Sequence, residues 1–168
     1  EVTTEVLDSL RIDYEVSGHS TYGLLQLLKK RCIGDAAEWV CFGATVQDVT
    51  DTWMMLTLKR TRQVICDDLR RLHDGLLMLC KAHRDTVMAG RTHGQQGLPI
   101  TFGYKVASWI AEVRRNMKRL EAYGAIGEVG QLSGAVGSLS GQGAKAFDIQ
   151  ATFCVELGLS VPDMSWGN

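Results

Sequence analysis

The sequence predicts an all-α fold built around a bundle of long helices. Residues 55–79 and 106–120 place apolar side chains at alternating intervals of three and four, which is the spacing of a helix seam that packs lengthwise on other helices. The chain has only 2 prolines among its 168 residues, and 7% of its residues are aromatic. Both values favour helices over strands, because proline interrupts a helix and aromatic side chains are enriched in sheets.

The composition is that of a soluble globular protein, and it excludes several kinds of partner. The chain is 45% hydrophobic and 22% charged, with a formal net charge of -1. A chain so close to neutral has no basic field that would attract nucleic acid. No stretch approaches the roughly 18 uninterrupted apolar residues that a membrane span needs. We therefore expect neither nucleic acid nor a membrane as a partner.

The cysteines indicate a reducing compartment. There are 5 of them, an odd number, and none belongs to a C-x-x-C pair, so neither a disulfide framework nor a zinc site is indicated. The N-terminal residues also lack the basic and apolar regions of a secretory signal. We expect a cytoplasmic protein that uses no metal and no cofactor.

Two short helices are expected at the N-terminal end. Apolar residues recur through residues 1–14, and a second helix follows Ser20 and ends between Lys29 and Arg31. His19 stands at the entrance of this second helix, where its ring and the nearby backbone N–H groups can face an anion. The alternative interpretation is that His19 only caps the helix.

The stretch W-V-C-F-G-A-T-V-Q-D-V-T-D-T, residues 39–52, introduces the next helix. Thr45 is placed to cap a helix that begins near Gln47. Asp48 and Asp51 lie in its first turn, where negative charge complements the positive end of the helix dipole. Capping is a sufficient explanation for these three side chains.

The longest helix of the chain follows, with a seam that extends over about seven turns. Arg62 is the single polar residue within this seam. Such a length implies packing against equally long partners. We interpret His73, beside the seam, and His83, in the charged connector after it, as structural residues. The apolar seam residues are Met55, Leu58, Ile65, Leu69, Leu72, Leu76 and Leu79.

A segment that carries a histidine then leads into the second seam helix. Glycines and a proline recur through residues 87–99 and predict an irregular loop. Thr101 is placed to cap a helix that begins between Pro99 and Phe102. His93 lies between a hydroxyl and two amide side chains, a setting that suits proton transfer or carboxylate binding. The alternative is a solvated loop histidine without a chemical role.

Seven glycines recur over residues 124–143. They predict either a helix with a stripe of small residues or a loop rich in backbone N–H donors. No Gly-Lys-Ser/Thr follows, so the segment is not a phosphate-binding P-loop. We favour an architectural role over a chemical one. An amphipathic helix is expected over residues 144–157, closed by Gly158.

Three blocks of sequence resemble, in order, those of one enzyme superfamily. Residues 90–103, G-R-T-H-G-Q-Q-G-L-P-I-T-F-G, resemble the block G-R-T-H-x-Q-x-x-x-P-x-T-F-G. Residues 43–52 are similar to G-x-T-S-Q-D-x-x-D-T, and residues 131–138 to a block that contains S-G-A-V-G-T. On these blocks the chain is identified as a member of the fumarase/aspartase superfamily, on the branch that holds adenylosuccinate lyase and 3-carboxy-cis,cis-muconate cycloisomerase.

The resemblance implies a small N-terminal helical domain, a central bundle of long helices and a C-terminal helical domain. Residues 1–42 would be the end of the N-terminal domain, and residues 43–168 part of the central bundle. It also implies a homotetramer in which each active site takes residues from three chains. Members of the superfamily are far longer, so we expect this chain to be a fragment.

The resemblance further implies elimination from a small dicarboxylate of the succinyl type, usually with release of fumarate. His93 would be the general acid that protonates the departing nitrogen or oxygen. The family's base is a serine on a loop of the form S-S-x-M-P-x-K-x-N, which does not occur in residues 1–168, so we expect the fragment alone to be inactive. The same resemblance assigns contacts with the substrate, mostly with its carboxylates, to Thr92, Thr45, His19, Gln95 and Ser138.

Two departures from the family pattern bear on the substrate. Val46 stands where the family has the serine of its Thr-Ser pair, which removes one hydrogen-bond donor. Gly18 and Ser20 flank His19 in place of the usual arginine and aspartate, which favours a substrate smaller than a nucleotide. Val46 and the absence of the serine loop leave an alternative open, a non-catalytic helical oligomerisation module with the same fold.

Overall fold

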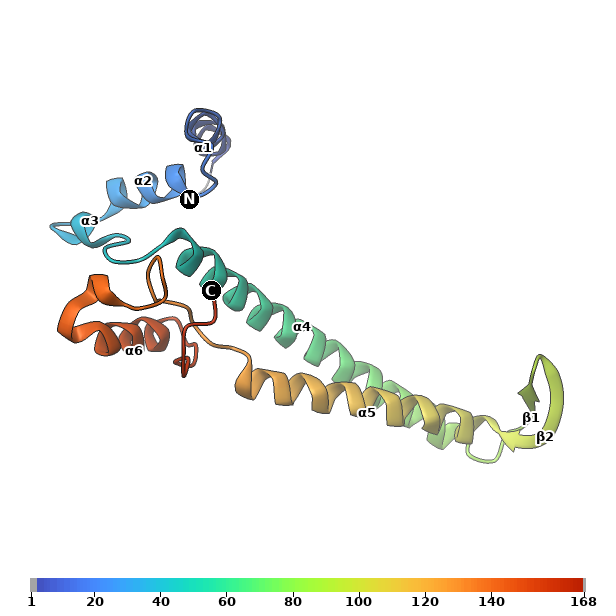
Figure 1. Ribbon diagram of the computed structural model, residues 1–168. Helices are drawn as coiled ribbons and strands as arrows, with labels where there is room; N and C mark the ends of the chain where they lie inside the picture. The colour runs from blue at the N-terminus through green and yellow to red at the C-terminus, as the bar shows by residue number, and fades with distance from the viewer. Residues whose placement is uncertain (1–2, 168) are drawn as a thin grey trace. The chain divides into compact units, whose positions relative to one another are not determined.

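The computed structural model describes residues 3–167, and helices dominate it (Figure 1). The all-α prediction is confirmed, because a two-stranded hairpin is the only sheet among the residues described. In chain order the elements are α1 (Thr4–Ser17), α2 (Tyr22–Arg31), α3 (Ala36–Trp39), α4 (Val46–Ala82), β1 (Val87–Thr92), β2 (Gln95–Thr101), α5 (Phe102–Ile126), the 3-10 helix η1 (Ser140–Lys145) and α6 (Ala146–Glu156).

These elements form two compact units. The first comprises the residues up to Met54 together with those from Val129 onward, and the second is Met55–Glu128. Helix α4 begins in the first unit and continues into the second. The expected domain boundary between residues 42 and 43 concerns the longer protein and stays a prediction.

The shorter helices end where local chemistry stops them. Helix α1 runs to Ser17 and is closed by Gly18, whose φ of 65° places it in the left-handed region and whose N–H donates to the carbonyl of Tyr14 at 2.8 Å. Helix α2 ends at Arg31, as predicted. Helix α6 begins two residues later than expected, because η1 precedes it, and Gly158 follows it with a φ of 65°.

A small apolar core holds the first unit together. Leu132, Leu139 and Ala146 are buried against one another, and Ala44 and Phe153 pack on them. These residues come from the entrance to α4, from the glycine-rich segment and from α6. The core therefore joins the second and third sequence blocks within one unit.

In the second unit, α4 and α5 lie side by side (Figure 1). The predicted seam of α5 is confirmed, because Val106 is fully buried and Ile110 and Val113 are each only 8% exposed. At the C-terminal end of α5, Arg62 of α4 donates from Nε to Glu128 Oε1 at 2.5 Å. Arg62, which interrupts the apolar seam in the sequence, thus joins α4 to the residues just after α5 through an ion pair with a nearly buried carboxylate.

The predicted irregular loop over residues 87–99 is wrong, because this segment forms the antiparallel hairpin β1–β2. Its glycines build the hairpin instead of breaking it. A register shift lies between Ala89 and Arg91, and a Cβ on Gly90 would stand 2.7 Å from the carbonyl oxygen of Leu98. Only glycine fits at this bulge without a shift of the backbone.

The hairpin leads directly into α5. Thr101 is the N-cap, as predicted, and its Oγ1 accepts a hydrogen bond from the backbone N–H of Tyr104 at 3.1 Å. The backbone N–H of Gly103 donates to the carbonyl of His83 at 2.8 Å. The ring of His83 packs edge-on against Phe102, with centroids 5.1 Å apart, which agrees with the structural role predicted for this histidine.

Gly103 is where the backbones of α4 and α5 meet, and a matched pair of substitutions tests this contact. A Cβ at Gly103 would lie within 2.9 Å of backbone atoms of Cys80, His83 and Arg84, whereas a Cβ at Gly75 would meet nothing within 4 Å. Gly103→Ala should lower the free energy of unfolding by about 1–3 kcal/mol. Gly75→Ala should raise it by about 0.5–1 kcal/mol, because alanine loses less entropy in a helix. Urea unfolding followed by circular dichroism measures both, and equal effects would contradict the close approach.

Candidate active site

The G-R-T-H block presents its polar side chains at the tip of the hairpin. Thr92 pairs with Gln95, and His93 and Gly94 form the two-residue turn between them. Both turn residues have positive φ, 49° and 73°, which matches the turns that suit the twist of a hairpin. Thr92, His93 and Gln95 are all exposed. The structure therefore brings three of the predicted site residues together and leaves the imidazole open to a ligand.

The second and third blocks are joined by one buried carboxylate. Asp48 is 2% exposed, and its two oxygens accept hydrogen bonds from the backbone N–H groups of Thr45 at 2.9 Å, Ser133 at 3.0 Å and Gly134 at 3.0 Å. The hydroxyl of Ser133 donates to the same carboxylate at 3.3 Å. The bond from Thr45 is half of a capping box, so the prediction that Asp48 serves the helix start is correct but incomplete.

Thr45 itself differs from the prediction in one respect. Helix α4 begins at Val46, one residue before the expected Gln47. The cap bond runs from the backbone of Thr45 to Asp48, and within residues 3–167 the Thr45 hydroxyl makes no hydrogen bond. Thr45 is partly exposed, so its hydroxyl is available to a ligand.

Further buried polar groups support this junction. The hydroxyl of Thr52 donates to the carbonyl of Gln131 at 2.9 Å and accepts from the N–H of the same residue at 3.0 Å. The side chain of Gln150 donates to the carbonyl of Leu132 at 2.8 Å. Capping alone, which the sequence predicts here, does not include these bonds. The spacing of Asp48 and Thr52 was the available signal, because residues four apart share one face of a helix.

A small pocket lies where these two blocks meet, and we call it the glycine pocket. It has a volume of about 260 Å³. Its lining residues are Gly43, Ala44, Ser133, Gly134, Ala135, Val136, Ser138, Ser140 and Gly141. Ser138 is thus placed beside Ala44, the neighbour of Thr45, and its hydroxyl donates to Ser140 Oγ at 3.1 Å. Ala135 and Val136 also line the pocket, and within the described chain their backbone N–H groups have no acceptor.

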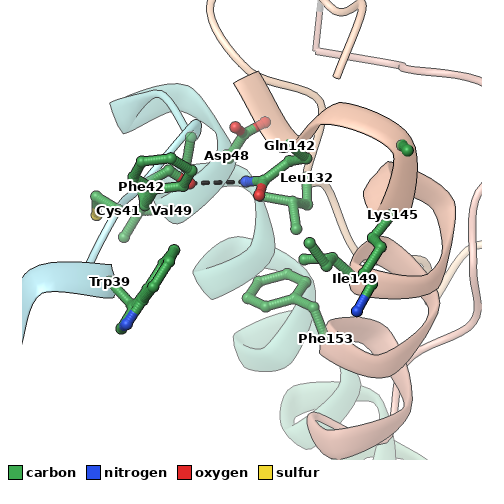
Figure 2. Close-up of a pocket in the computed structure, with 12 residues that line it drawn as sticks. Trp39, Cys41, Phe42, Asp48, Val49, Leu132, Gln142, Lys145, Ile149 and Phe153 are labelled. Atoms are coloured by element: carbon green, nitrogen blue, oxygen red, sulfur yellow. Dashed lines mark hydrogen bonds between the residues drawn. The ribbon is translucent and has the colours of Figure 1, made fainter. Parts of the chain in front are cut away.

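A larger apolar pocket of about 460 Å³ adjoins the same junction (Figure 2). Trp39 stands on one side of it, with Ile149 and Phe153 on the other, and Gln142 donates to the carbonyl of Phe42 at 2.7 Å across its edge. Sequence reasoning missed this pocket, because its lining comes from α3, α4, η1 and α6 and has no motif of its own.

Two lining residues of the apolar pocket carry functional groups that the sequence did not highlight. Lys145 is the cation of this lining. Burial raises the pKa of the Cys41 thiol, an effect that Lys29 opposes and Asp48 reinforces, so the thiol is protonated at neutral pH. We therefore do not assign Cys41 a role as a nucleophile.

His19 lies in the first unit, exposed at the entrance to α2, and lines neither pocket. Its Nδ1 is 3.4 Å from both the backbone nitrogen and the hydroxyl of Thr21. These contacts are those of a helix-entry residue, and its predicted contact with substrate stays a prediction.

Between residues 3 and 167, no three His, Cys, Asp or Glu side chains are grouped so that they could hold a metal ion. No helix in this range is both long and apolar enough to cross a membrane.

Known proteins resemble the chain over most of its length. The lyase family matches residues 10–166. N-acetyl-S-(2-succino)cysteine lyase of Dickeya dadantii is 36% identical over 88% of this chain and 32% of its own length. Adenylosuccinate lyase of Methanothermobacter thermautotrophicus is 38% identical over 94% of this chain and 34% of its own length.

A solved structure agrees with these relatives. The crystal structure of a fumarate lyase from Mesorhizobium sp. BNC1 superposes with a TM-score of 0.89 at 35% identity, over 99% of this chain and 38% of that one. The chain thus spans about a third of the length of the curated relatives it matches. Sequence blocks, helical fold and relatives agree, and the chain belongs to the lyase family of the fumarase/aspartase, or fumarate lyase, superfamily.

Proposed function

We propose that this chain is part of an enzyme that eliminates a nitrogen, oxygen or sulfur group from a succinyl-type dicarboxylate and releases fumarate. The observation that carries the proposal is the exposed His93, held on a two-residue turn between Thr92 and Gln95. The names of the relatives support it, since one is an adenylosuccinate lyase and one an N-acetyl-S-(2-succino)cysteine lyase.

In the proposed reaction a base removes a proton from the carbon next to one carboxylate. The electron pair left on that carbon forms the double bond as the bond to the leaving atom breaks, and the His93 imidazolium gives its proton to that atom. Thr92 and Gln95, beside His93, would orient the substrate through its carboxylates. Thr45 and Ser138, in the second and third blocks, would bind a carboxylate through their hydroxyls.

The catalytic base is proposed to lie in the rest of the full-length protein, because the S-S-x-M-P-x-K-x-N loop does not occur in residues 1–168. His19 would contact the substrate from the N-terminal domain. The absence of this loop also leads us to propose that residues 1–168 alone do not turn over substrate. From the unpaired pattern of the cysteines we propose that the active enzyme acts in the cytoplasm, and from the resemblance that it uses no cofactor.

The substrate is proposed to be smaller than a nucleotide. Val46 supplies no hydroxyl where the family has serine, and Gly18 and Ser20 supply no charge beside His19. The glycine pocket, at about 260 Å³, has room for a carboxylate and its neighbouring atoms. An S- or N-succinyl amino acid fits these features better than adenylosuccinate does.

We also propose a homotetramer. Leu58, Ile65 and Leu72 are spaced by seven residues on α4, and they are 39%, 42% and 49% exposed. A heptad stripe of this kind is the seam of a helix that packs on another long helix. Copies of α4 from other subunits would cover the stripe and would bring the polar blocks of different chains together.

A second candidate function is a non-catalytic oligomerisation module with the same fold. Val46 favours it, because a missing hydroxyl in the second block weakens carboxylate binding. The same open stripe on α4 serves this alternative equally well. Turnover of a succinyl substrate by the full-length protein would exclude it.

His93→Asn in the full-length protein tests the acid. Asparagine tolerates the left-handed backbone of the turn but cannot deliver a proton from an imidazolium, so the fold should persist and kcat should fall by about 10²–10⁴-fold. Ultraviolet absorbance measures turnover: fumarate is followed with adenylosuccinate, N-acetyl-S-(2-succino)cysteine and N-substituted aspartates, and the ring-opened carboxymuconate is followed with carboxymuconolactone. His73→Asn, in α4 and outside both pockets, is the matched control. If His93→Asn keeps its kcat, His93 is not the acid.

Ile65→Glu combined with Leu72→Glu tests the assembly. Ile65 and Leu72 are 42% and 49% exposed, so covering each in an interface contributes about 1 kcal/mol, and a glutamate there adds a desolvated charge. The double variant should therefore dissociate, and multi-angle light scattering should find subunits where the wild type gives a tetramer. Gln63→Glu adds one such charge at an exposed position of α4 and should leave the tetramer intact. An unchanged mass for the double variant would rule out this seam.

A further inference from the structure

We propose that Asp48 is a positioning residue for carboxylate binding: its buried carboxylate holds the Ser133–Gly134 backbone against the start of α4 and thereby sets the shape of the glycine pocket. This inference rests on the proposed function, since it concerns a substrate carboxylate. It assigns Asp48 no contact with the substrate and no part in proton transfer.

The first step is the way in which the charge of Asp48 is satisfied. At 2% exposure the carboxylate is out of water, and among the described residues no cation pairs with it. Its partners are the three backbone N–H groups of Thr45, Ser133 and Gly134, the hydroxyl of Ser133 and the positive end of α4. A buried charge held in this way is costly to leave unpaired, so it ties its donors together strongly.

The second step is that these donors belong to the walls of the glycine pocket. Ser133 and Gly134 line one wall, and Gly43 and Ala44, directly before Thr45, line the other. The walls meet backbone to backbone: a Cβ at Gly141 would lie 2.8 Å from Gly43 Cα, and one at Gly134 would lie 3.0 Å from Gly43 O. The side chain of Gln142 bridges the Gly141 segment to the carbonyl of Phe42 at 2.7 Å, whereas the hydrogen bonds to Asp48 hold the Ser133–Gly134 wall against the start of α4.

The third step is that some backbone N–H groups of the glycine-rich loop bond to Asp48 and others do not. Asp48 occupies the N–H groups of Ser133 and Gly134, while within residues 3–167 those of Ala135 and Val136 have no acceptor. The φ of Gly134 is 78°, so the chain turns sharply between the occupied and the open donors. The Asp48 carboxylate thus holds the loop through the N–H groups of Ser133 and Gly134. The N–H groups of the next two residues are left for a carboxylate of the substrate.

Two hydrogen bonds between Thr52 and Gln131 also join α4 to the glycine-rich loop, but their role is structural only. Thr52 is 3% exposed and bonds the backbone of Gln131 through its hydroxyl in both directions. It lies one helical turn after Asp48 and ties down the same loop, but neither Thr52 nor Gln131 lines the glycine pocket. Thr52 is therefore the matched control.

The experiment compares Asp48→Asn and Thr52→Val in the full-length protein. Asparagine keeps the shape of Asp48 but places an NH2 donor against N–H donors, so the loop should move off the start of α4. We expect both variants to lose stability in thermal unfolding. Only Asp48→Asn should raise the KM for the succinyl substrate, by at least tenfold, with kcat changed less than threefold, because carboxylate binding is lost equally in the ground state and the transition state.

Two results would overturn the proposal: an unchanged KM in Asp48→Asn, or an equal rise in both variants, which is the mark of a structural role alone. If Asp48→Asn does not fold, Gly134→Ala disturbs the same wall with Asp48 intact, and a KM within twofold of the wild type would then overturn it.

Failure of the proposed function is a separate outcome, because the wild type itself would then be inactive on every substrate. In that case calorimetric titration with fumarate decides. Binding by the wild type and by Thr52→Val that Asp48→Asn lacks supports the proposal, and equal binding by all three, or none, overturns it.

Discussion

One buried negative charge joins the start of α4 to the glycine-rich loop in the first unit. The carboxylate of Asp48 is buried and has no cation beside it in the described chain. Two segments of the chain satisfy it instead with hydrogen bonds from backbone N–H groups. One of these segments is the start of a helix, where such groups are unpaired in any case. The other is a glycine-rich loop 85 residues further on. Satisfying the charge therefore requires the two segments to meet, and the apolar contacts of Leu132 and Leu139 follow from that meeting.

The helices of the second unit could be predicted from the sequence because their determinants are local. A seam spacing of three and four fixes which face of α5 is buried, and Val106, Ile110 and Val113 lie where that spacing puts them. The same rule predicted a seam on α4. Within this chain α5 is the long helix that α4 packs on, and Leu58, Ile65 and Leu72 remain substantially exposed. Periodicity identifies an apolar face, but it does not say which chain covers it.

The hairpin could not be predicted in the same way. Residues 87–101 lack the alternation of apolar and polar residues that marks a strand, because β1 and β2 have no extensive core to face and most of their residues are exposed. The glycines that predicted a loop have positional roles in a hairpin, with Gly90 at a bulge and Gly94 in the turn. The site residues in the G-R-T-H block were identified from resemblance, whereas their mutual geometry depends on this register.

The backbone conformation of His93 in the turn bears on its proposed role as a proton donor. A left-handed backbone costs a non-glycine residue about 1–2 kcal/mol, and asparagine or glycine at this position would relieve that cost. A turn of two residues, however, holds its side chains more rigidly than a long loop, because both strands fix the backbone on either side. A proton donor needs such a fixed position, since transfer requires contact within hydrogen-bond reach. The strained backbone at His93 is therefore what we expect where placement of the imidazole matters more than local stability.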